Sequence, residues 1–299
     1  MNTGLGFIDL IDQKTTEKIE REAKEGKKKN PLRPSSAGSC TRVLTFQMME
    51  YLKRAEYKRK LFEPSVHRLL KLGSSVEWHV IDQFKLINED YEIRYKQQAL
   101  DFGVITSSVD PSLSCRIEGA IDFVIWGEDT KCVADVKSVK DWSRGWKTHW
   151  SDVAEKLERM PSVESISDKV FWVEDLVAFL AELKDPFFES NFCQVNFYAN
   201  NEFLKNRDIN QGAIIKYNKN TSQWREIRFK PSEEIYQKTL SKFQSVLDAV
   251  AKGGPEHAKR DYDPKTHMVC RYCKFSAQCR KIPTQLSEGE TNKEVPNGI

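Results

Sequence analysis

The sequence predicts a mixed α/β fold in which helices flank a central β-sheet. Short runs typical of strands fill residues 91–140, and helical patterns precede and follow them. A further strand pair and a long helix follow between residues 211 and 251. Of the 299 residues, 39% are hydrophobic, which is enough to form a core and excludes a wholly disordered chain.

The elements are expected in the following order. Residues 1–34 form a basic N-terminal segment, with a helix at about 15–25 and then a flexible connector broken by Pro31 and Pro34. The main domain spans 35–282, and we expect the polar tail 283–299 to be disordered. We expect helices at 35–60, 64–84, 141–192 (a helical insertion), 192–207 and 232–251. We expect strands at 91–100, 114–126, 131–139, 211–217 and 223–229.

The charge balance and the cysteines limit the classes of function. Lys and Arg exceed Asp and Glu by 47 − 44 = 3, so any nucleic-acid-binding surface must be a local patch. No apolar run approaches the ~18 residues of a membrane helix and no signal-peptide pattern begins the chain, so we expect a cytoplasmic protein without a membrane contact. No phosphate-binding loop occurs, which argues against an NTP-driven motor. Seven cysteines, an odd number, argue against a disulfide framework.

The most informative segment predicts a β-hairpin that brings two carboxylates together. Residues 127–130 form a four-residue turn signal between two strand-like runs. If Trp126 pairs with Lys131, then Asp122 lies directly opposite Asp135. Two acidic groups that face each other between apolar strands are destabilising unless a positive charge lies between them.

The same register gives the predicted site a lysine. Lys137 shares a face with Asp135 because strand side chains alternate, and it would lie opposite Ala120. A divalent cation would relieve the repulsion between the acids, and the lysine could hold an attacking water. The alternative is a solvent-facing Asp/Lys pair on an edge hairpin, and a one-residue slip of register would separate the acids.

Four short motifs follow one another along the chain. They are Leu72-Gly73-Ser-Ser-Val-Glu77, Gly119-Ala-Ile-Asp122, Asp135-Val-Lys137 and Gln194-Val-Asn-Phe-Tyr198. In this order they resemble the motifs of the PD-(D/E)xK nuclease superfamily, and in particular its RecB-like branch. The resemblance implies a restriction-endonuclease-like core that carries a site for Mg²⁺ or Mn²⁺.

The resemblance also implies roles for individual residues. Asp122, Asp135 and the Val136 carbonyl would hold the metal, with Glu77 as a further ligand, and Lys137 would position the nucleophile. Asp135 stands where a glutamate is commoner, which leaves the metal preference open.

Two of the implied assignments have alternatives. His79 could be the ligand in place of Glu77, and the two point roughly 200° apart on a helix, so only one can face the metal. Gln194 and Tyr198 are four residues apart and so share a helix face, from which they would contact DNA and orient the active site. The alternative for this pair is packing between the helix and the sheet.

The cysteines near the C-terminus predict a metal site. Cys270, Cys273 and Cys279 supply three thiolates, and tetrahedral zinc and iron–sulfur sites both need four. Cys40 is the candidate for the fourth ligand, because one Cys before the core and three after it resemble the RecB-like iron–sulfur exonucleases, such as the AddB nuclease domain and CRISPR-associated RecB-like exonucleases. The resemblance implies a 4Fe-4S cluster that joins the two chain ends. Zinc is the alternative, in which case His267 could replace Cys40.

A tryptophan stripe lies in the predicted insertion. Trp142, Trp146 and Trp150 recur every four residues, and Arg144 and Lys147 lie between them. Aromatic side chains interleaved with cations suit stacking on single-stranded bases. The alternative is that the stripe packs this helix against the core.

The resemblance as a whole implies a metal-dependent DNA exonuclease that prefers single strands or DNA ends. It would act in recombination, repair or CRISPR-type processing in a bacterial or phage-infected cell, with a helicase or a recombination or CRISPR protein as partner. The alternative is a catalytically silent iron–sulfur or zinc subunit that binds DNA or acts in assembly. The sequence leaves the oligomeric state open.

Overall fold

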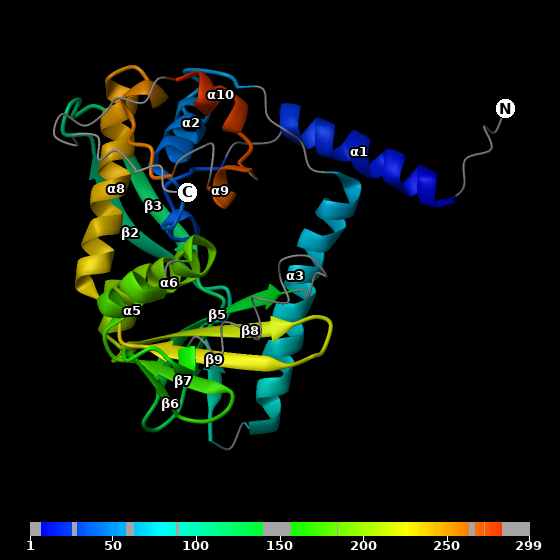
Figure 1. Ribbon diagram of the computed structural model, residues 1–299, viewed down its shortest axis with the longest axis vertical. Coiled ribbons are helices and arrows are strands. Elements are labelled where there is room, and N and C mark those ends of the chain that lie inside the picture. Colours follow the sequence, from blue (N-terminus) through cyan, green and yellow to red (C-terminus); the bar gives the residue numbers. More distant parts are fainter. Residues whose placement is uncertain are drawn as a thin grey trace, which may run out of the picture.

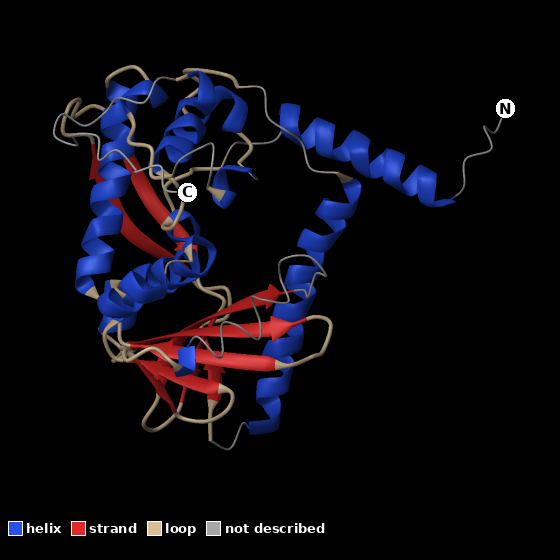
Figure 2. Cartoon of the chain, in the orientation of Figure 1, coloured by secondary structure: helices blue, strands red, loops and turns tan. Residues whose placement is uncertain are grey.

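The computed structural model describes residues 7–25, 29–57, 63–87, 90–139, 157–183, 185–262, 267–271 and 273–282. These residues form a mixed seven-stranded sheet flanked by helices, with a separate two-stranded sheet beneath a second group of helices (Figure 1, Figure 2). The predicted mixed α/β class is confirmed. No helix in this described part is long and apolar enough to cross a membrane.

The elements have the following bounds. The helices are α1 (Phe7–Glu25), η1 (Pro34–Ser36), α2 (Thr41–Tyr51), α3 (Pro64–Gln83), η2 (Phe84–Ile87), α5 (Leu176–Leu183), α6 (Pro186–Ala199), α7 (Glu202–Lys205), α8 (Glu233–Ala251), η3 (Pro255–His257), α9 (Met268–Arg271) and α10 (Ser276–Lys281). The strands are β1 (Glu92–Arg94), β2 (Ala99–Thr106), β3 (Ser114–Ala120), β4 (Phe123–Trp126), β5 (Lys131–Val139), β6 (Val163–Ser165), β7 (Val170–Val173), β8 (Gln211–Asn218) and β9 (Trp224–Phe229).

The large sheet has the strand order β1-β4-β5-β8-β9-β7-β6. Strands β5 and β8 pair in parallel at its centre, and β4 pairs with β5 antiparallel. The β4–β5 ladder ends at the pair Phe123–Ala134, so residues 135–139 extend beyond β4 while they remain paired to β8. This overhang leaves one side of β5 open to groups from other elements.

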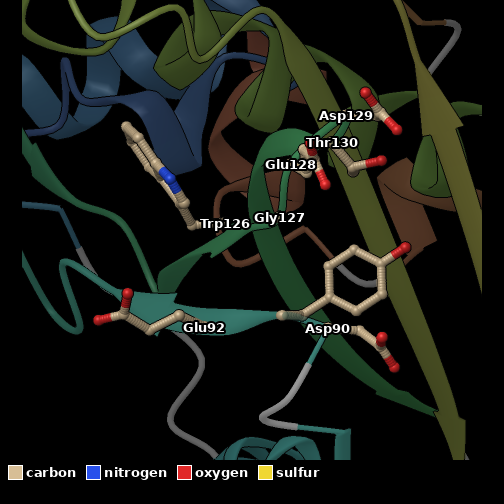
Figure 3. A pocket seen from close by; sticks show the side chains of 8 residues that line it. Asp90, Glu92, Trp126, Gly127, Glu128, Asp129 and Thr130 are labelled. Atoms are coloured by element: carbon tan, nitrogen blue, oxygen red, sulfur yellow. The ribbon is translucent and has the colours of Figure 1, made fainter.

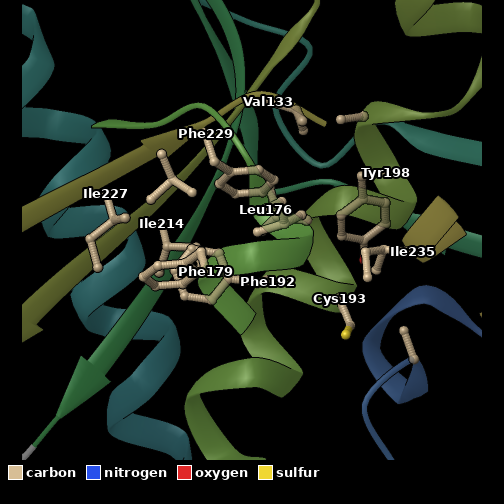
Figure 4. Packing of buried hydrophobic residues seen from close by; sticks show 14 of the residues in the cluster. Val133, Leu176, Phe179, Phe192, Cys193, Tyr198, Ile214, Ile227, Phe229 and Ile235 are labelled. Carbon is tan, nitrogen blue, oxygen red and sulfur yellow. The ribbon is translucent and has the colours of Figure 1, made fainter. Parts of the chain in front are cut away.

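Both faces of the sheet are packed. On one face Ile214 and Phe229 meet Phe179 and Phe192 from α5 and α6 (Figure 4). On the other face α3 supplies Val80 and other apolar side chains to a second cluster. Alternate residues of the central strands β4, β5 and β8 are therefore buried on opposite faces, which sets the side on which each polar residue of these strands lies.

The prediction of a single strand over 114–126 is wrong. The chain breaks at Ile121 and Asp122, so that β3 pairs with β2 in the small sheet and β4 pairs in the large sheet. Ala120 therefore pairs with Ala99, and its predicted position opposite Lys137 is wrong. The reason is local, because the Ile121 N–H donates to the Gln98 carbonyl and the Asp122 carbonyl accepts from another loop amide.

The prediction of helix throughout 141–192 is also wrong. Residues 163–165 and 170–173 are the strands β6 and β7 at the edge of the large sheet. Phe171 and Val173 alternate with less buried residues, and β7 pairs with β9, so β-branched and aromatic side chains follow the two-residue period of a strand. The tryptophan stripe and the cations between it, Trp142, Arg144, Trp146, Lys147 and Trp150, lie outside the described residues, and their role stays a prediction.

The N-terminal elements differ from the prediction in their bounds. Helix α1 begins at Phe7 and not near residue 15, and the helix expected over 35–60 ends at Tyr51. The expected flexible connector is anchored close to the main domain, because Leu32 is fully buried and the Asn30 side chain donates to the Arg116 carbonyl. The tail 283–299 lies outside the described residues.

The strand expected over 91–100 is divided between β1 in the large sheet and β2 in the small sheet, and the helix expected over 192–207 is divided between α6 and α7. Other predicted elements agree with the structure. Strands β8 and β9 form the expected antiparallel pair, and α3 covers the expected range. Helix α8 begins where predicted because the Ser232 hydroxyl accepts from the Ile235 N–H as an N-cap.

Candidate active site at the end of strand β5

Two charged residues of the predicted motif lie on the overhanging end of β5. Asp135 and Lys137 point to the same face of the sheet, the face that α6 covers, and Asp135 is only 2% exposed. The Lys137 Nζ lies 2.7 Å from Asp135 Oδ2 and donates to Asp135 Oδ1 at 3.0 Å. Burial lowers the pKa of Lys137, but the charge of Asp135 and the hydrogen bond to it, together with the charges of Asp122 and Glu77, outweigh burial, and the net shift is upward. The lysine is therefore a fixed cation.

The second acid comes from the start of β4. Trp126 pairs with Lys131, so the predicted hairpin register is confirmed. Asp122 directly precedes β4, and its Oδ2 accepts from the Val136 N–H at 3.0 Å. Burial and then repulsion from Asp135 raise the pKa of Asp122 to about 7. Asp135 thus lies close enough to oppose the ionisation of Asp122.

Helix α6 brings the Gln-x-x-x-Tyr pair onto the same acids. The Gln194 Nε2 donates to Asp135 Oδ1 at 2.9 Å, and its Oε1 accepts from Lys137 Nζ at 3.2 Å. Tyr198 is 4% exposed and hydrogen-bonds to Gln194, and burial followed by Asp135 raises its pKa. Gln194 therefore contacts both the acid and the lysine, and is not only a packing residue between helix and sheet.

A third carboxylate reaches the site from α3. Glu77 is half-buried, and burial followed by Asp135 raises its pKa. The Gln97 Nε2 donates to Glu77 Oε1 at 2.5 Å, while the Gln97 backbone N–H donates to the Asp122 carbonyl at 3.0 Å. Gln97 holds a φ of 51°, a left-handed conformation that a non-glycine residue rarely adopts. This loop residue connects Glu77 to the segment that carries Asp122.

The alternative ligand His79 lies elsewhere. It is exposed, and its ring packs against Tyr217 at 5.7 Å and Trp224 at 6.3 Å between ring centroids. Tyr217 belongs to the apolar cluster on the opposite face of the sheet from Lys137. Of the two candidates on α3, the structure places Glu77 near the acids.

This placement predicts that substitutions of Glu77 and His79 have different effects on activity. We expect Glu77→Gln to lower any metal-dependent activity about tenfold to a hundredfold, because it removes one charge that faces the cation. His79→Gln, the matched control on the same helix, should retain activity within about threefold. Rates measured over a Mn²⁺ titration check this, and a larger loss in His79→Gln than in Glu77→Gln would contradict the placement.

The donor chemistry of this site fits a divalent cation. Asp135 Oδ2 is buried and has no hydrogen bond of proper geometry despite its ionic contact with Lys137, and three carboxylates, those of Asp135, Asp122 and Glu77, surround this lysine. Among the described residues, no three acidic, His or Cys side chains converge closely enough to enclose a metal ion. Mg²⁺ uses one or two carboxylates and completes its shell with water and phosphate, so Asp122 and Asp135 are a sufficient protein contribution.

The four predicted cluster cysteines are brought into one region. Burial, and then the neighbouring Cys40, raise the pKa of the Cys270 thiol to about 11, and Cys40 acts in the same direction on Cys273. Cys279 influences both C-terminal thiols. The thiols are not close enough to confirm a metal cluster, since the described residues contain no metal-binding group of three such side chains. The remaining cysteines, Cys115, Cys132 and Cys193, are buried as predicted.

Protein contacts join the two chain ends around these cysteines. The Thr41 N–H and hydroxyl donate to Asp261, and the Arg42 guanidinium donates to the Ala258 carbonyl at 2.8 and 3.1 Å. Phe46 stacks on Phe275 with centroids 5.0 Å apart. The α2 segment therefore meets the C-terminal segment through polar and aromatic contacts of its own.

The alternative zinc ligand His267 has other contacts. Its ring stacks on Tyr262 at 4.3 Å between centroids, and its Nδ1 accepts from the Val269 N–H at 3.3 Å. One ring nitrogen is thus engaged with the backbone.

Two residues of the site were not predicted. Gln97 carries no sequence signal, because its role depends on a loop that joins two sheets. Lys216 lies beside Lys137 in the β5–β8 ladder. A single lysine inside the apolar run 213–217 was a signal that could have been noticed.

A pocket of 660 Å³ lies away from these acids, over β1 and the β4–β5 turn (Figure 3). Its lining includes the carboxylates of Asp90, Glu92, Glu128 and Asp129. Trp126 also lines it, and cations of neighbouring residues cover its ring. An acidic lining repels a phosphate backbone, so this pocket is unsuited to nucleic acid.

Fold and site together define a mixed α/β protein with an acid–lysine centre on a central strand. No protein-family model matches the chain, and no curated protein is similar enough in sequence to be matched. The crystal structure of SSO0001 is similar at a TM-score of 0.46 and 13% identity, covering 94% of this chain and 100% of that one. The crystal structure of LHK-Exo in complex with dAMP is similar at a TM-score of 0.36 and 10% identity, covering 74% and 89%. Similarity at this level carries no argument about function, which rests on the site.

Proposed function

We propose that this protein is a metal-dependent nuclease that hydrolyses phosphodiester bonds in DNA. One observation carries the proposal, namely that Asp122 and Asp135 oppose each other beside Lys137 and Gln194, which are hydrogen-bonded to each other. A buried acid whose pKa is raised by a neighbouring carboxylate is typical of sites that bind a cation or catalyse reactions, and a purely structural ion pair would not need the second acid.

The residues of the site have separable roles in this proposal. Asp122, Asp135 and the Val136 carbonyl, with Glu77, would hold a Mg²⁺ or Mn²⁺ ion. Such an ion, when bound, neutralises charge on the phosphate and lowers the pKa of water. Lys137 donates a hydrogen bond to the attacking water or to a phosphate oxygen, and Gln194 keeps the ammonium group in place. Water adds to phosphorus and the P–O bond breaks, which leaves a phosphate monoester and a hydroxyl group.

The finer parts of the proposal rest on the motif resemblance. We propose exonuclease action on single strands or DNA ends in recombination, repair or CRISPR-type processing. A helicase or a recombination or CRISPR protein is the partner class that the resemblance implies. Tyr198, buried beside Asp135, would orient the site through Gln194.

We also propose that Cys40, Cys270, Cys273 and Cys279 hold a 4Fe-4S cluster, with zinc as the alternative. Support comes from the meeting of α2 with the C-terminal segment and from the mutual influence of the thiols. Iron, sulfide and zinc contents of anaerobically purified protein decide between the metals. Cys40→Ser should lose the metal, whereas the buried but distant Cys132→Ser should retain it, and equal metal content in all three proteins would contradict the assignment.

Cleavage of end-labelled DNA tests the enzymatic proposal. We expect cleavage of single-stranded or end-containing substrates with Mg²⁺ or Mn²⁺, none with a chelator, and none from Asp135→Asn. Asp129→Asn, in the exposed β4–β5 turn, is the matched control and should cleave normally. Metal-loaded wild type that binds DNA but cleaves no substrate would overturn the nuclease and favour the silent DNA-binding or assembly subunit.

A further inference from the structure

A second lysine lies on the same face of the sheet as the proposed catalytic groups. Lys216 on β8 is the direct partner of Lys137 on β5, and partners in a parallel ladder point to the same face. The pair one step back, Asp135 and Ile214, lies two residues before them on the same face. Lys216 therefore belongs to the surface that carries the acids.

The environment of Lys216 is unusual for an ammonium group. The side chain is half-buried, and its Nζ lies 4.3 Å from the centre of the Phe188 ring of α6. In the part of the chain that the structure describes, no hydrogen bond or ion pair reaches the Lys216 Nζ, whereas the Lys137 Nζ bonds both Asp135 and Gln194. The face of one aromatic ring stabilises a cation only weakly compared with a hydrogen-bonded anion.

The surroundings of the Lys216 amine disfavour its charged form. Burial, and then the positive charge of Lys137, lower the pKa of Lys216 to about 7. Asp135 and Asp185 act in the opposite direction but do not restore it. A half-buried ammonium group that bonds no anion destabilises the isolated protein, and an anionic ligand would supply a bonded partner.

The geometry of the sheet indicates which anionic ligand would reach Lys216. Asp122 and Asp135 flank the space between β4 and β5, whereas Lys216 lies on β8 on the far side of β5. Strands are ~4.8 Å apart, so Lys216 lies on the order of 10 Å from the Asp122 side of the site. A phosphate held at the acids would leave Lys216 facing the next phosphate along the same nucleic-acid strand.

We propose that Lys216 binds the phosphate that neighbours the scissile one, and so selects a polynucleotide over a small phosphodiester. The inference rests on the proposed nuclease function and adds a substrate-binding residue to it. The same lysine contributes one charge to the local patch that a chain with a net charge of only +3 needs for nucleic-acid binding.

The first experiment measures binding without turnover. Single-stranded DNA is titrated into wild type, Lys216→Met, Lys216→Arg and the exposed control Lys252→Met, in chelator at several salt concentrations. We expect Lys216→Met to weaken binding about tenfold and to reduce the slope of log K against log salt by about 0.7, the value for one lost contact with a single strand. Lys216→Arg should keep the slope, and Lys252→Met should match wild type. Unchanged affinity and slope in Lys216→Met would overturn the proposal.

The second experiment identifies the phosphate. Substrates carry an uncharged methylphosphonate at the phosphate on the 5′ or the 3′ side of the scissile bond. We expect one of the two methylphosphonate substrates to bind wild type as much more weakly as Lys216→Met binds the unmodified substrate. The same methylphosphonate should not weaken the binding of Lys216→Met any further. Full additivity at both positions would overturn the assignment. In cleavage assays Lys216→Met should raise KM and leave kcat within about twofold, whereas a lower kcat at constant KM would place the lysine at the scissile phosphate instead.

These measurements separate the two proposals. Binding in chelator does not depend on catalysis, so a wild type that never cleaves would overturn the nuclease, while a weaker affinity and a smaller salt slope in Lys216→Met would still support the phosphate site. Conversely, cleavage with no effect of Lys216→Met would overturn only this inference. Methionine keeps the apolar stem and removes the desolvated charge, so thermal unfolding of the variant should occur at or above the wild-type temperature.

Discussion

Replacing Asp122 with asparagine is expected to stabilise the metal-free protein and to abolish its cleavage activity. The carboxyl has a pKa of about 7 in the folded protein against an ordinary 3.8, because of burial and then of Asp135. Well below pH 3.8, at about pH 3, it is protonated in both the folded and the unfolded state. As the pH rises from about 4 to about 7 the unfolded chain loses this proton before the folded protein does, so stability falls and then stays lower. The asparagine variant does not lose stability in this way, because its amide does not ionise.

The expected gain is on the order of 2 kcal/mol in the free energy of unfolding at about pH 8, and close to zero at about pH 3. An amide oxygen can still accept from the Val136 N–H, so the local hydrogen bond is kept. Cleavage should fall at least ~10³-fold, because a carboxylate that faces a divalent cation contributes several kcal/mol to the transition state.

Denaturant unfolding in chelator, and again with Mn²⁺, measures both effects. Wild type should gain stability from the cation, whereas Asp122→Asn should gain little. Asp129→Asn, in the exposed turn of the same hairpin, is the control and should follow wild type at each pH. An asparagine variant less stable than wild type at about pH 8 in chelator would contradict this prediction, because the ionised carboxylate would then stabilise the folded protein without a cation.

Replacing Gly38 with alanine is expected to cause the largest loss of stability. A Cβ at this position would lie less than 3.0 Å from Ser190 Cα, Cβ and Oγ. A backbone atom cannot rotate away, so the loop before Cys40 would have to separate from α6. We expect a loss of about 3 kcal/mol or more in the free energy of unfolding.

The substitution should also shift Gln194 relative to Asp135 and Lys137, because α6 carries Gln194. Urea unfolding, with the exposed Ser35→Ala as control, measures the stability change. Ser190→Gly combined with Gly38→Ala should restore only part of the loss, since the Ser190 Cα remains in place. A Gly38→Ala protein within about 0.5 kcal/mol of wild type would contradict the close packing of this loop on the helix.

The elements that the sequence predicted well depend on neighbouring residues. The four-residue turn 127–130 sets which residues pair across β4 and β5, and so the Trp126–Lys131 register followed from local sequence. The two-residue period of β8 and β9 and the N-cap Ser232 of α8 are equally local signals.

The failures in the sheets involve contacts between segments far apart in the chain. Residues 114–126 have strand propensity throughout, and nothing local indicates that the chain leaves one sheet at Ile121 and joins another. Strand β7 is stabilised by pairing with β9, more than fifty residues later. Its four residues alone give too weak a strand signal to be distinguished from the helical pattern around them. Gln97 holds a left-handed conformation because its two hydrogen bonds compensate the strain.

By itself, the sequence determined the mixed α/β class, the hairpin that opposes Asp122 and Asp135, and the helix face that carries Gln194 and Tyr198. These features follow from turn length and side-chain period, which operate over a few residues. Only the tertiary structure decided between Glu77 and His79 as the neighbour of the acids, and brought Lys216 beside Lys137. Such contacts depend on how α3 and β8 pack on the sheet, because a side chain's distance to a remote group is set by the packing of whole elements and not by its neighbours in the chain.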